Sequence, residues 1–395
     1  MSKFSKIEIV VFLTLLISIG FVVPRFARAQ TEATVYVCPE VASLEEVNPR
    51  CPGKTILKLG ETINGLTLAT TNYENQEYYL VLGFINGGGG VNLPPVAEVN
   101  GPYQGDAGLP IVLDASNSSD PNNDPLQYRW DFDDDGAWDT EWLSVSIINH
   151  IWNNDYEGNI KLEISDGEFS AIDTAIVNVK SPKTLKEEAI SELEAAKTGD
   201  KKADEKISRI IKHIQNSLAE NLWLDASHLI FFKKDTCRDS EIFELNPESM
   251  NLEETFEFEP DNAELKMRNN FKEECFIPRF GLMVFHEEYL AVKSMLQQLK
   301  EKPRIPEELK TIFSQVIAKL VKADQLLAKV AIYDAKNTPI QNPKFQKLID
   351  RQIRKAEEEF AKAEKEIANN KPDKAILRLA KSWLYGQLVI KFASL

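Results

Sequence analysis

The sequence has 395 residues, 46 of them Lys or Arg and 61 of them Asp or Glu, so its formal net charge is −15. Hydrophobic residues make up 43% of the chain, which is enough for a buried core and excludes a globally disordered protein. A net negative chain does not coat a polyanion, which disfavours nucleic-acid binding. At roughly 100–200 residues per domain, this length suggests two or three domains.

The first 29 residues have the layout of a secretory signal peptide. Lys3 and Lys6 precede an apolar stretch at residues 9–23, and Ala27-Arg28-Ala29 offers a small-x-small cleavage site. That stretch is shorter than the about 20 residues that cross a bilayer as a helix, which favours cleavage over the alternative of an uncleaved N-terminal anchor. Either way, we expect the rest of the chain to be exported and to be secreted or attached to the cell surface.

Export bears on the four cysteines, which are Cys38, Cys51, Cys237 and Cys275. Disulfides persist outside the cytoplasm, and four cysteines allow three pairings. Local pairing, Cys38 with Cys51 and Cys237 with Cys275, is the simplest because each bond then stays within one region. A zinc site is the alternative, but the chain has no C-x-x-C and its four histidines are scattered.

Residues 30–86 predict a small β unit. Segments 34–37, 55–59 and 77–85 are rich in β-branched or aromatic residues, and Asn64-Gly65 supplies a turn. The following run of four glycines predicts a flexible linker over residues 87–91.

Residues 92–180 predict a second β region, with six or seven short strands in about 90 residues, as in a sandwich. Ile160, Leu162 and Ile164 alternate with polar residues, which is typical of a half-buried strand. The strands that we expect are 111–113, 126–132, 145–152, 159–164 and 173–179.

This region also carries a series of motifs in a recognisable order. They are Leu93-Pro94-Pro95-Val96-Ala97, Gly101-Pro102-Tyr103, Leu113-Asp114-Ala115-Ser116-Asn117-Ser118-Ser119-Asp120-Pro121, Tyr128-Arg129-Trp130-Asp131-Phe132-Asp133, His150-Ile151-Trp152 and Ser165-Asp166-Gly167. The series resembles the PKD (polycystic-kidney-disease) repeat over nearly the whole of 92–180. Trp152 stands where that family usually has Tyr, and Asp134 stands where Gly is common. The resemblance implies an immunoglobulin-like sandwich, an extracellular setting, and a spacer or adhesive role without catalysis.

Residues 183–395 predict a helical bundle, because apolar residues recur there at gaps of three and four. The clearest stripe, over residues 343–369, is compatible with a coiled coil whose partner lies in the same chain. Residues 235–282 interrupt the pattern and predict an insertion pinned by Cys237 and Cys275. The region resembles only loosely the helical segments that follow PKD repeats in prokaryotic surface proteins. The predicted fold class is therefore multidomain, β then α: a small β unit, an immunoglobulin-like PKD sandwich and an all-α bundle.

The negative charge is concentrated in the predicted sandwich. Residues 91–180 contain 17 acidic and 3 basic side chains, whereas residues 181–395 contain 36 of each. The densest cluster places Asp131, Asp133, Asp135, Gly136 and Asp139 at positions 1, 3, 5, 6 and 9 of a calcium loop. Trp142 occupies position 12, where a bidentate Glu would complete an EF-hand, so we expect a weak site.

A second acidic turn contains Asp120, Asn122 and Asp124, which we expect to share one calcium ion with the first cluster if the two loops meet. The alternative for both loops is a solvated acidic turn without an ion.

Three tryptophans lie close to the acidic loop in the sequence. Trp138 and Trp142 flank it and are candidates for stacking on a sugar ring, with packing at the sandwich edge as the alternative. Trp130 is expected to be the buried strand tryptophan of the sandwich.

No residue is predicted to be catalytic. His286-Glu287-Glu288-Tyr289 begins like a zinc-peptidase motif, but Leu290 stands where the second histidine is needed. The G-x-S-x-G, phosphate-loop and dinucleotide fingerprints do not occur.

The sequence therefore favours a non-enzymatic extracellular or cell-surface protein with an adhesive or scaffolding role, stiffened by calcium. The alternative is a non-catalytic accessory that brings an extracellular hydrolase to polysaccharide or protein. A third hypothesis, a hydrolase hidden in the helical region, requires clustered titratable residues in a pocket. The expected partners are extracellular polysaccharide or a surface protein, with no nucleic acid, and a membrane only through an uncleaved N-terminal segment.

Overall fold

The computed structural model describes residues 22–24, 34–39, 53–73, 76–82, 87–231, 257–259, 264–266, 279–300 and 305–394. The chain divides into two compact units. The first comprises residues 1–102, 112–148 and 158–176, and the second comprises residues 103–111, 149–157 and 177–395. The second unit therefore contains the helices together with three segments of the 92–180 region.

One N-terminal sheet has the order β3-β2-β7 and forms around β2 (Thr34–Pro39). Both neighbours, β3 (Thr55–Leu57) and β7 (Gly87–Asn92), pair with β2 antiparallel. The predicted linker at 87–91 is therefore wrong, because all four glycines lie in a strand. Glycine has no side chain to favour the extended conformation, so the backbone hydrogen bonds along β2 hold this strand, and residues 87–91 alone do not reveal such a partner.

A second sheet has the order β1-β6-β5-β4, with β1 at Val22–Pro24, β4 at Thr62–Ile63, β5 at Leu66–Tyr73 and β6 at Gln76–Leu82. The predicted turn between β4 and β5 is confirmed, since Asn64 and Gly65 have φ values of 51° and 80°, as a two-residue hairpin of this kind requires.

The two export-related predictions fall largely outside the described residues. Within the predicted signal peptide, only Val22–Pro24 is described, as a strand paired with β6, so the peptide and its cleavage stay predictions. Among the described helices, none has the length and apolar character needed to cross a membrane. Cys38 is disulfide-bonded, but Cys51, Cys237 and Cys275 lie outside the described residues, so the pairing also stays a prediction.

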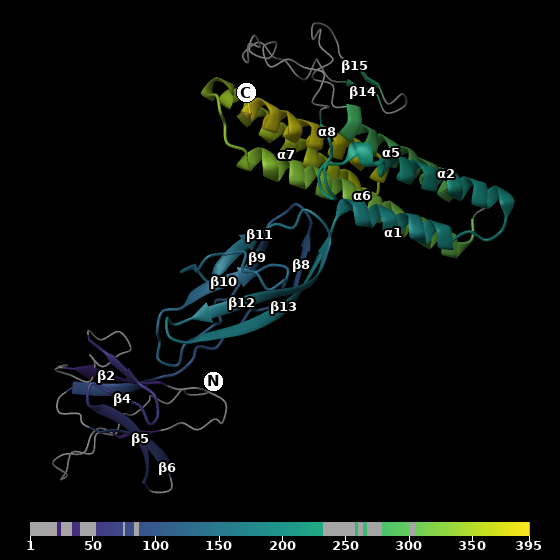
Figure 1. Cartoon of the computed structure of the whole chain (residues 1–395). Helices are drawn as coiled ribbons and strands as arrows, with labels where there is room; N and C mark the ends of the chain where they lie inside the picture. The colour runs from purple at the N-terminus through teal and green to yellow at the C-terminus, as the bar shows by residue number, and fades with distance from the viewer. Residues whose placement is uncertain are drawn as a thin grey trace. The chain divides into compact units, whose positions relative to one another are not determined.

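The 92–180 region forms a two-sheet β fold (Figure 1). One sheet has the order β10-β12-β13-β8, and the other pairs β9 with β11. The predicted strands are confirmed with small shifts, and β8, which pairs parallel with the end of β13, was not predicted. The bounds are β8 Tyr103–Asp106, β9 Ile111–Asp114, β10 Gln127–Asp131, β11 Ile147–His150, β12 Tyr156–Ser165 and β13 Ser170–Lys180.

The core of this fold is built from the alternation that the sequence shows. Trp130 and the three alternating residues of β12 are fully buried, together with Leu113 and Val177. The Ser165-Asp166-Gly167 motif makes the turn into β13. Asp166 Oδ1 accepts hydrogen bonds from the backbone N–H groups of Glu168 and Phe169 at 2.7 Å.

The helical region is a bundle of long helices around a single apolar core (Figure 1). Helices α1 (Pro182–Ala195) and α8 (Pro372–Ala393) both pack on α6 (Glu307–Asn337), whereas α2 (Lys201–Ser217) packs on α5 (Arg279–Lys300). The predicted stripe at 343–369 forms α7 (Gln346–Ala368), which packs on α8 of the same chain. Two short helices, η2 (Glu220–Leu222) and η4 (Pro343–Phe345), complete the described helices.

The predicted insertion at 235–282 lies mostly outside the described residues. Within it, β14 (Glu257–Glu259) and β15 (Glu264–Lys266) pair antiparallel, and α5 already begins at Arg279.

Candidate functional site

The acidic loop starts where β10 ends, at Asp131. Two residues of this loop have left-handed backbone angles: Asp134 with φ 54° and Gly136 with φ 93°. Such angles favour glycine, so Asp134 occupies a position where the backbone suits glycine better than aspartate. The loop closes on the strand through Trp130, whose carbonyl oxygen accepts from the backbone N–H of Asp139 at 2.9 Å.

The loop brings three of the predicted calcium ligands together. One carboxylate oxygen from each of Asp131, Asp133 and Asp139 lies within 4.8 Å of the others, and the described part of the chain contains no second group of this kind. Asp131 is 1% exposed, and its Oδ1 has no hydrogen-bond partner. Buried polar atoms are nearly always paired, so this oxygen is the feature of the loop that most needs a ligand.

The charges in the loop are unevenly compensated. Burial alone raises the pKa of Asp131, but the backbone N–H groups of Gly136 and Asp133, together with Lys161, outweigh it and lower the pKa. Desolvation and the carboxylate of Asp135 raise the pKa of Asp133. Lys161 lies 3.5 Å from Asp131 Oδ2 and pairs with Asp134 at 2.5 Å. The loop therefore holds more negative charge than its one lysine compensates.

The remaining predicted ligands do not join this group. Asp135 Oδ1 accepts from the backbone N–H of Ala137 at 2.7 Å, and Asp135 stays exposed. Asp120 Oδ1 accepts from the backbone N–H groups of Asn122 and Asp124 and so holds its own turn closed. Asp120 and Asp124 do not belong to the group formed by Asp131, Asp133 and Asp139, so the condition for a shared ion, that the two loops meet, is not fulfilled in the described structure.

Trp138 and Trp142 form a stack that the sequence did not reveal. The guanidinium of Arg129 lies 4.3 Å from the ring centroid of Trp138 and 4.5 Å from that of Trp142. Arg129 Nε also donates to Glu163 Oε2 at 2.6 Å, and the Glu163 side chain is only 10% exposed. Both tryptophans are half-buried, so the arginine fixes two aromatic rings beside the acidic loop.

Replacing Arg129 with alanine should lower the free energy of unfolding by about 1–3 kcal/mol, because two cation–π contacts are lost and the carboxylate of Glu163 is left without its partner. Urea denaturation measures the change. Lys180→Ala is the control, since it removes an exposed ion pair with Glu188 and should cost under about 1 kcal/mol. Equal effects of the two variants would contradict the structural role of the stack.

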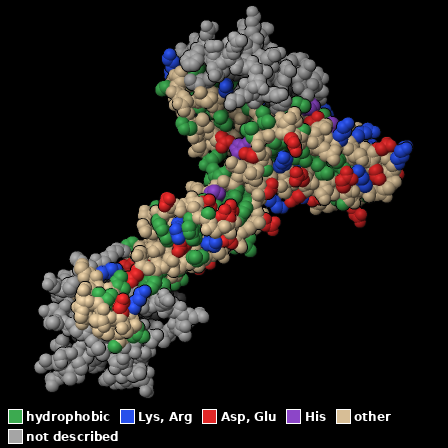
Figure 2. Space-filling view, in the orientation of Figure 1, with side chains coloured by type: hydrophobic (Ala, Val, Ile, Leu, Met, Phe, Trp, Pro, Cys, Tyr) green, Lys and Arg blue, Asp and Glu red, His purple; other side chains and the backbone are tan. Residues whose placement is uncertain are grey.

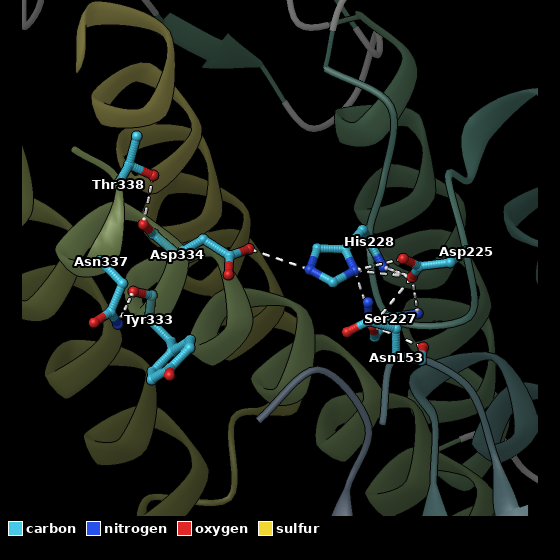
Figure 3. A network of polar contacts seen from close by, with 8 residues as sticks. All are labelled: Asn153, Asp225, Ser227, His228, Tyr333, Asp334, Asn337 and Thr338. Atoms are coloured by element: carbon cyan, nitrogen blue, oxygen red, sulfur yellow. Dashed lines mark hydrogen bonds and ion pairs between the residues drawn. The ribbon is translucent and has the colours of Figure 1, made fainter. Parts of the chain in front are cut away.

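A second polar network surrounds His228 (Figure 3). His228 Nδ1 lies 2.8 Å from both carboxylate oxygens of Asp225 and 2.9 Å from Ser227 Oγ, whereas Nε2 lies 3.2 Å from Asp334. Burial alone lowers the pKa of His228, but the bonds to Asp225 and Asp334 outweigh it and raise the pKa to about 9. The imidazolium therefore ties the segment before residue 231 to α6.

This network is not arranged for nucleophilic catalysis. In a serine triad the serine and the carboxylate bind opposite nitrogens of the imidazole, whereas here Ser227 and Asp225 share Nδ1 and Asp334 occupies Nε2. Ser227 Oγ instead donates to the carbonyl oxygen of Asn153 at 2.9 Å. A cavity of about 460 Å³ adjoins His228 and Asp334, with Leu224, Asn337 and Gln387 also in its lining.

The histidine motif noted in the sequence also has structural partners. His213 Nδ1 lies 2.6 Å from Glu287 Oε2, and Glu288 is fully buried in an ion pair with Lys186.

Acidic and basic side chains are interspersed over the exposed face of the helical region (Figure 2).

The fold and its loops define the class of module at residues 92–180 as an immunoglobulin-like sandwich. The family model described as "PKD domain" matches these same residues, 92–180. The chain therefore contains a PKD domain over the range that the sequence motifs predicted, and PKD domains are non-catalytic modules.

Three solved structures with some likeness share low TM-scores. The first comes from work on the specificity of carbohydrate-binding modules of the beta-sandwich superfamily (27% identity, 22% of this chain, 35% of that chain, TM-score 0.20). The second is a nucleoside hydrolase-related protein from Saccharophagus degradans (28% identity, 22% of this chain, 26% of that chain, TM-score 0.18). The third contains extracellular domains 3–5 of Drosophila OTK (15% identity, 38% of this chain, 52% of that chain, TM-score 0.19). This chain thus spans at most about half of each structure, and no curated protein matches it.

Proposed function

We propose that this chain is an extracellular, non-enzymatic binding protein whose PKD domain binds calcium through Asp131, Asp133 and Asp139 and is stiffened by it. The proposal is supported by the close approach of these three carboxylates, one of which, that of Asp131, has a buried Oδ1 without a hydrogen-bond partner. A PKD domain suits an adhesive or binding role outside the cytoplasm, where calcium is abundant enough for a weak site.

The donor set fits calcium rather than a transition metal. Carboxylate oxygens are the ligands of hard cations, and the three aspartates offer no nitrogen or sulfur. Lys161 is already paired with Asp134, so an ion beside Asp131 Oδ1 need not break that pair. Without the bidentate Glu of an EF-hand, we expect a dissociation constant of about 10⁻⁴–10⁻³ M, as in extracellular modules.

Titration of the full chain with calcium in an isothermal calorimeter tests this site, because it measures the dissociation constant directly. Asp131→Asn should weaken binding at least about tenfold, because it removes the charge of the central ligand. Asp135→Asn is the matched control: it removes one charge from the same loop outside the triad and should leave affinity within about threefold. Equal losses in both variants, or no calcium binding by the parent protein, would refute the site.

A second candidate function rests on the aromatic stack. Trp138 and Trp142 are held at the surface by Arg129, and fixed aromatic rings can stack on sugar rings. A protein that binds polysaccharide through such a surface can bring a partner hydrolase to its substrate. Pull-down of the protein by insoluble polysaccharides, compared between the parent and Trp138→Ala, tests it, and retention unchanged by the substitution would contradict it.

A further inference from the structure

The helical bundle buries three ionisable side chains together. Lys186 of α1, Glu288 of α5 and Asp324 of α6 are each 0% exposed. Lys186 Nζ is in direct contact with Glu288 Oε1, and the ring of Trp223 covers the amine, with its centroid 4.4 Å from Nζ. Asp324 interacts electrostatically with both Glu288 and Lys186.

This cluster is poorly satisfied as an ordinary ion pair. Although Lys186 and Glu288 touch, neither the amine nor either Glu288 oxygen has a partner with hydrogen-bond geometry, and the same holds for both oxygens of Asp324. Buried charges are costly unless well-aligned hydrogen bonds compensate them. Burial, followed by the charge of Glu288, raises the pKa of Asp324 well above its usual range, which favours its protonated form.

We infer that Lys186 and Glu288 join in an intramolecular isopeptide bond, with Asp324 as the acid–base group that relays protons. Two features of the geometry favour this reaction: the amine touches the carboxyl group, and all three side chains are fully buried away from water. The reaction begins with transfer of a proton from Lys186 to the Glu288 carboxyl group that it contacts, because a neutral lysine amine is a competent nucleophile.

The step balances without any co-reactant. Lys186 first passes one proton to the Glu288 carboxylate. The amine nitrogen then attacks Glu288 Cδ, so the C–N bond forms and the C=O electron pair moves onto oxygen. Asp324 donates its proton to the hydroxyl, which leaves as water when the C=O bond re-forms, and Asp324 recovers a proton from the nitrogen. The products are one amide and one water, and Asp324 is unchanged.

Peptide mapping of the reduced, unfolded and trypsin-digested full chain tests the bond. If it forms, trypsin releases residues 184–197 and 280–293 as one joined peptide, lighter than their sum by one water molecule. Fragmentation should place the link at Lys186 and Glu288. Recovery of peptide 280–293 without a link, together with peptides 184–186 and 187–197 cut apart after an unmodified Lys186, would overturn the inference without the need for any variant.

Two variants test the roles of the partners. Lys186→Met keeps the length of the side chain but removes the nucleophile, so the joined peptide should vanish. Asp324→Asn keeps the shape but removes the relayed proton, so the joined fraction should fall at least about tenfold. Far-ultraviolet circular dichroism checks that both variants stay helical. An Asp324→Asn protein that is helical and as fully joined as the parent would overturn the relay role.

Discussion

Trp130→Ala should lower the free energy of unfolding of the PKD domain by about 3–5 kcal/mol, the range found when a large buried aromatic side chain is removed. Trp130 is fully buried at the centre of the sandwich. Its backbone also holds the acidic loop, because its N–H donates to Thr140 Oγ1 at 2.9 Å and its carbonyl oxygen accepts from Asp139. Although alanine keeps these backbone groups, the cavity left by the ring should loosen the strand that positions them, and so weaken calcium binding as well as stability.

Hydrogen exchange of the β10 and β12 amides in the full chain measures this change within the domain, because these strands pair directly. Trp138→Ala is the control, since that ring is half-buried and its removal should cost about 1 kcal/mol. If exchange in β10 and β12 responds no more to Trp130→Ala than to Trp138→Ala, the proposed core is incorrect.

The contribution of His228 to stability should disappear at alkaline pH. Its pKa rises from 6.5 to about 9 in the folded chain, so the imidazolium stabilises the fold fully below about pH 6.5. That contribution is lost as pH rises through about 9. A shift of this size corresponds to about 3 kcal/mol, since the side chain is only 21% exposed.

His228→Gln isolates this effect because glutamine keeps hydrogen-bonding capacity but carries no charge. The difference in unfolding free energy between the parent and His228→Gln should be largest at about pH 6 and should shrink towards pH 10. Urea titrations at several pH values measure it. A difference that stays constant over this range would show that the charge of His228 does not stabilise the fold.

Local patterns in the sequence were sufficient to predict the PKD domain. Its strands follow a two-residue alternation of apolar and polar residues. Trp130 is a buried strand residue, Asp131 stands at the end of a strand, and Gly136 adopts a left-handed turn, and each of these roles follows from the local sequence. The glycine strand β7 could not be predicted in this way. Its extended conformation depends on pairing with β2, some fifty residues earlier in the chain.

The charged cluster in the bundle has a weak signature in the sequence. Lys186, Glu288 and Asp324 each occupy a position that continues the apolar stripe of its helix, such as Asp324 between Leu320 and Leu327. A charged residue at such a position is commonly solvated at the edge of a stripe, and only the packing of three helices brings these three together. The contacts of Arg129 with Trp138 and Trp142 also depend on the folded loop rather than on local sequence.

Calcium-dependent binding by the PKD domain can be measured as retention of the labelled full chain on its own cells and on isolated wall polysaccharides, first in calcium and then in chelator. We expect the protein to be retained in calcium and released by chelator. Asp131→Asn should abolish this retention, and Asp135→Asn should preserve it. Retention that is equal in calcium, in chelator and in both variants would contradict a calcium-dependent PKD domain as the binding module.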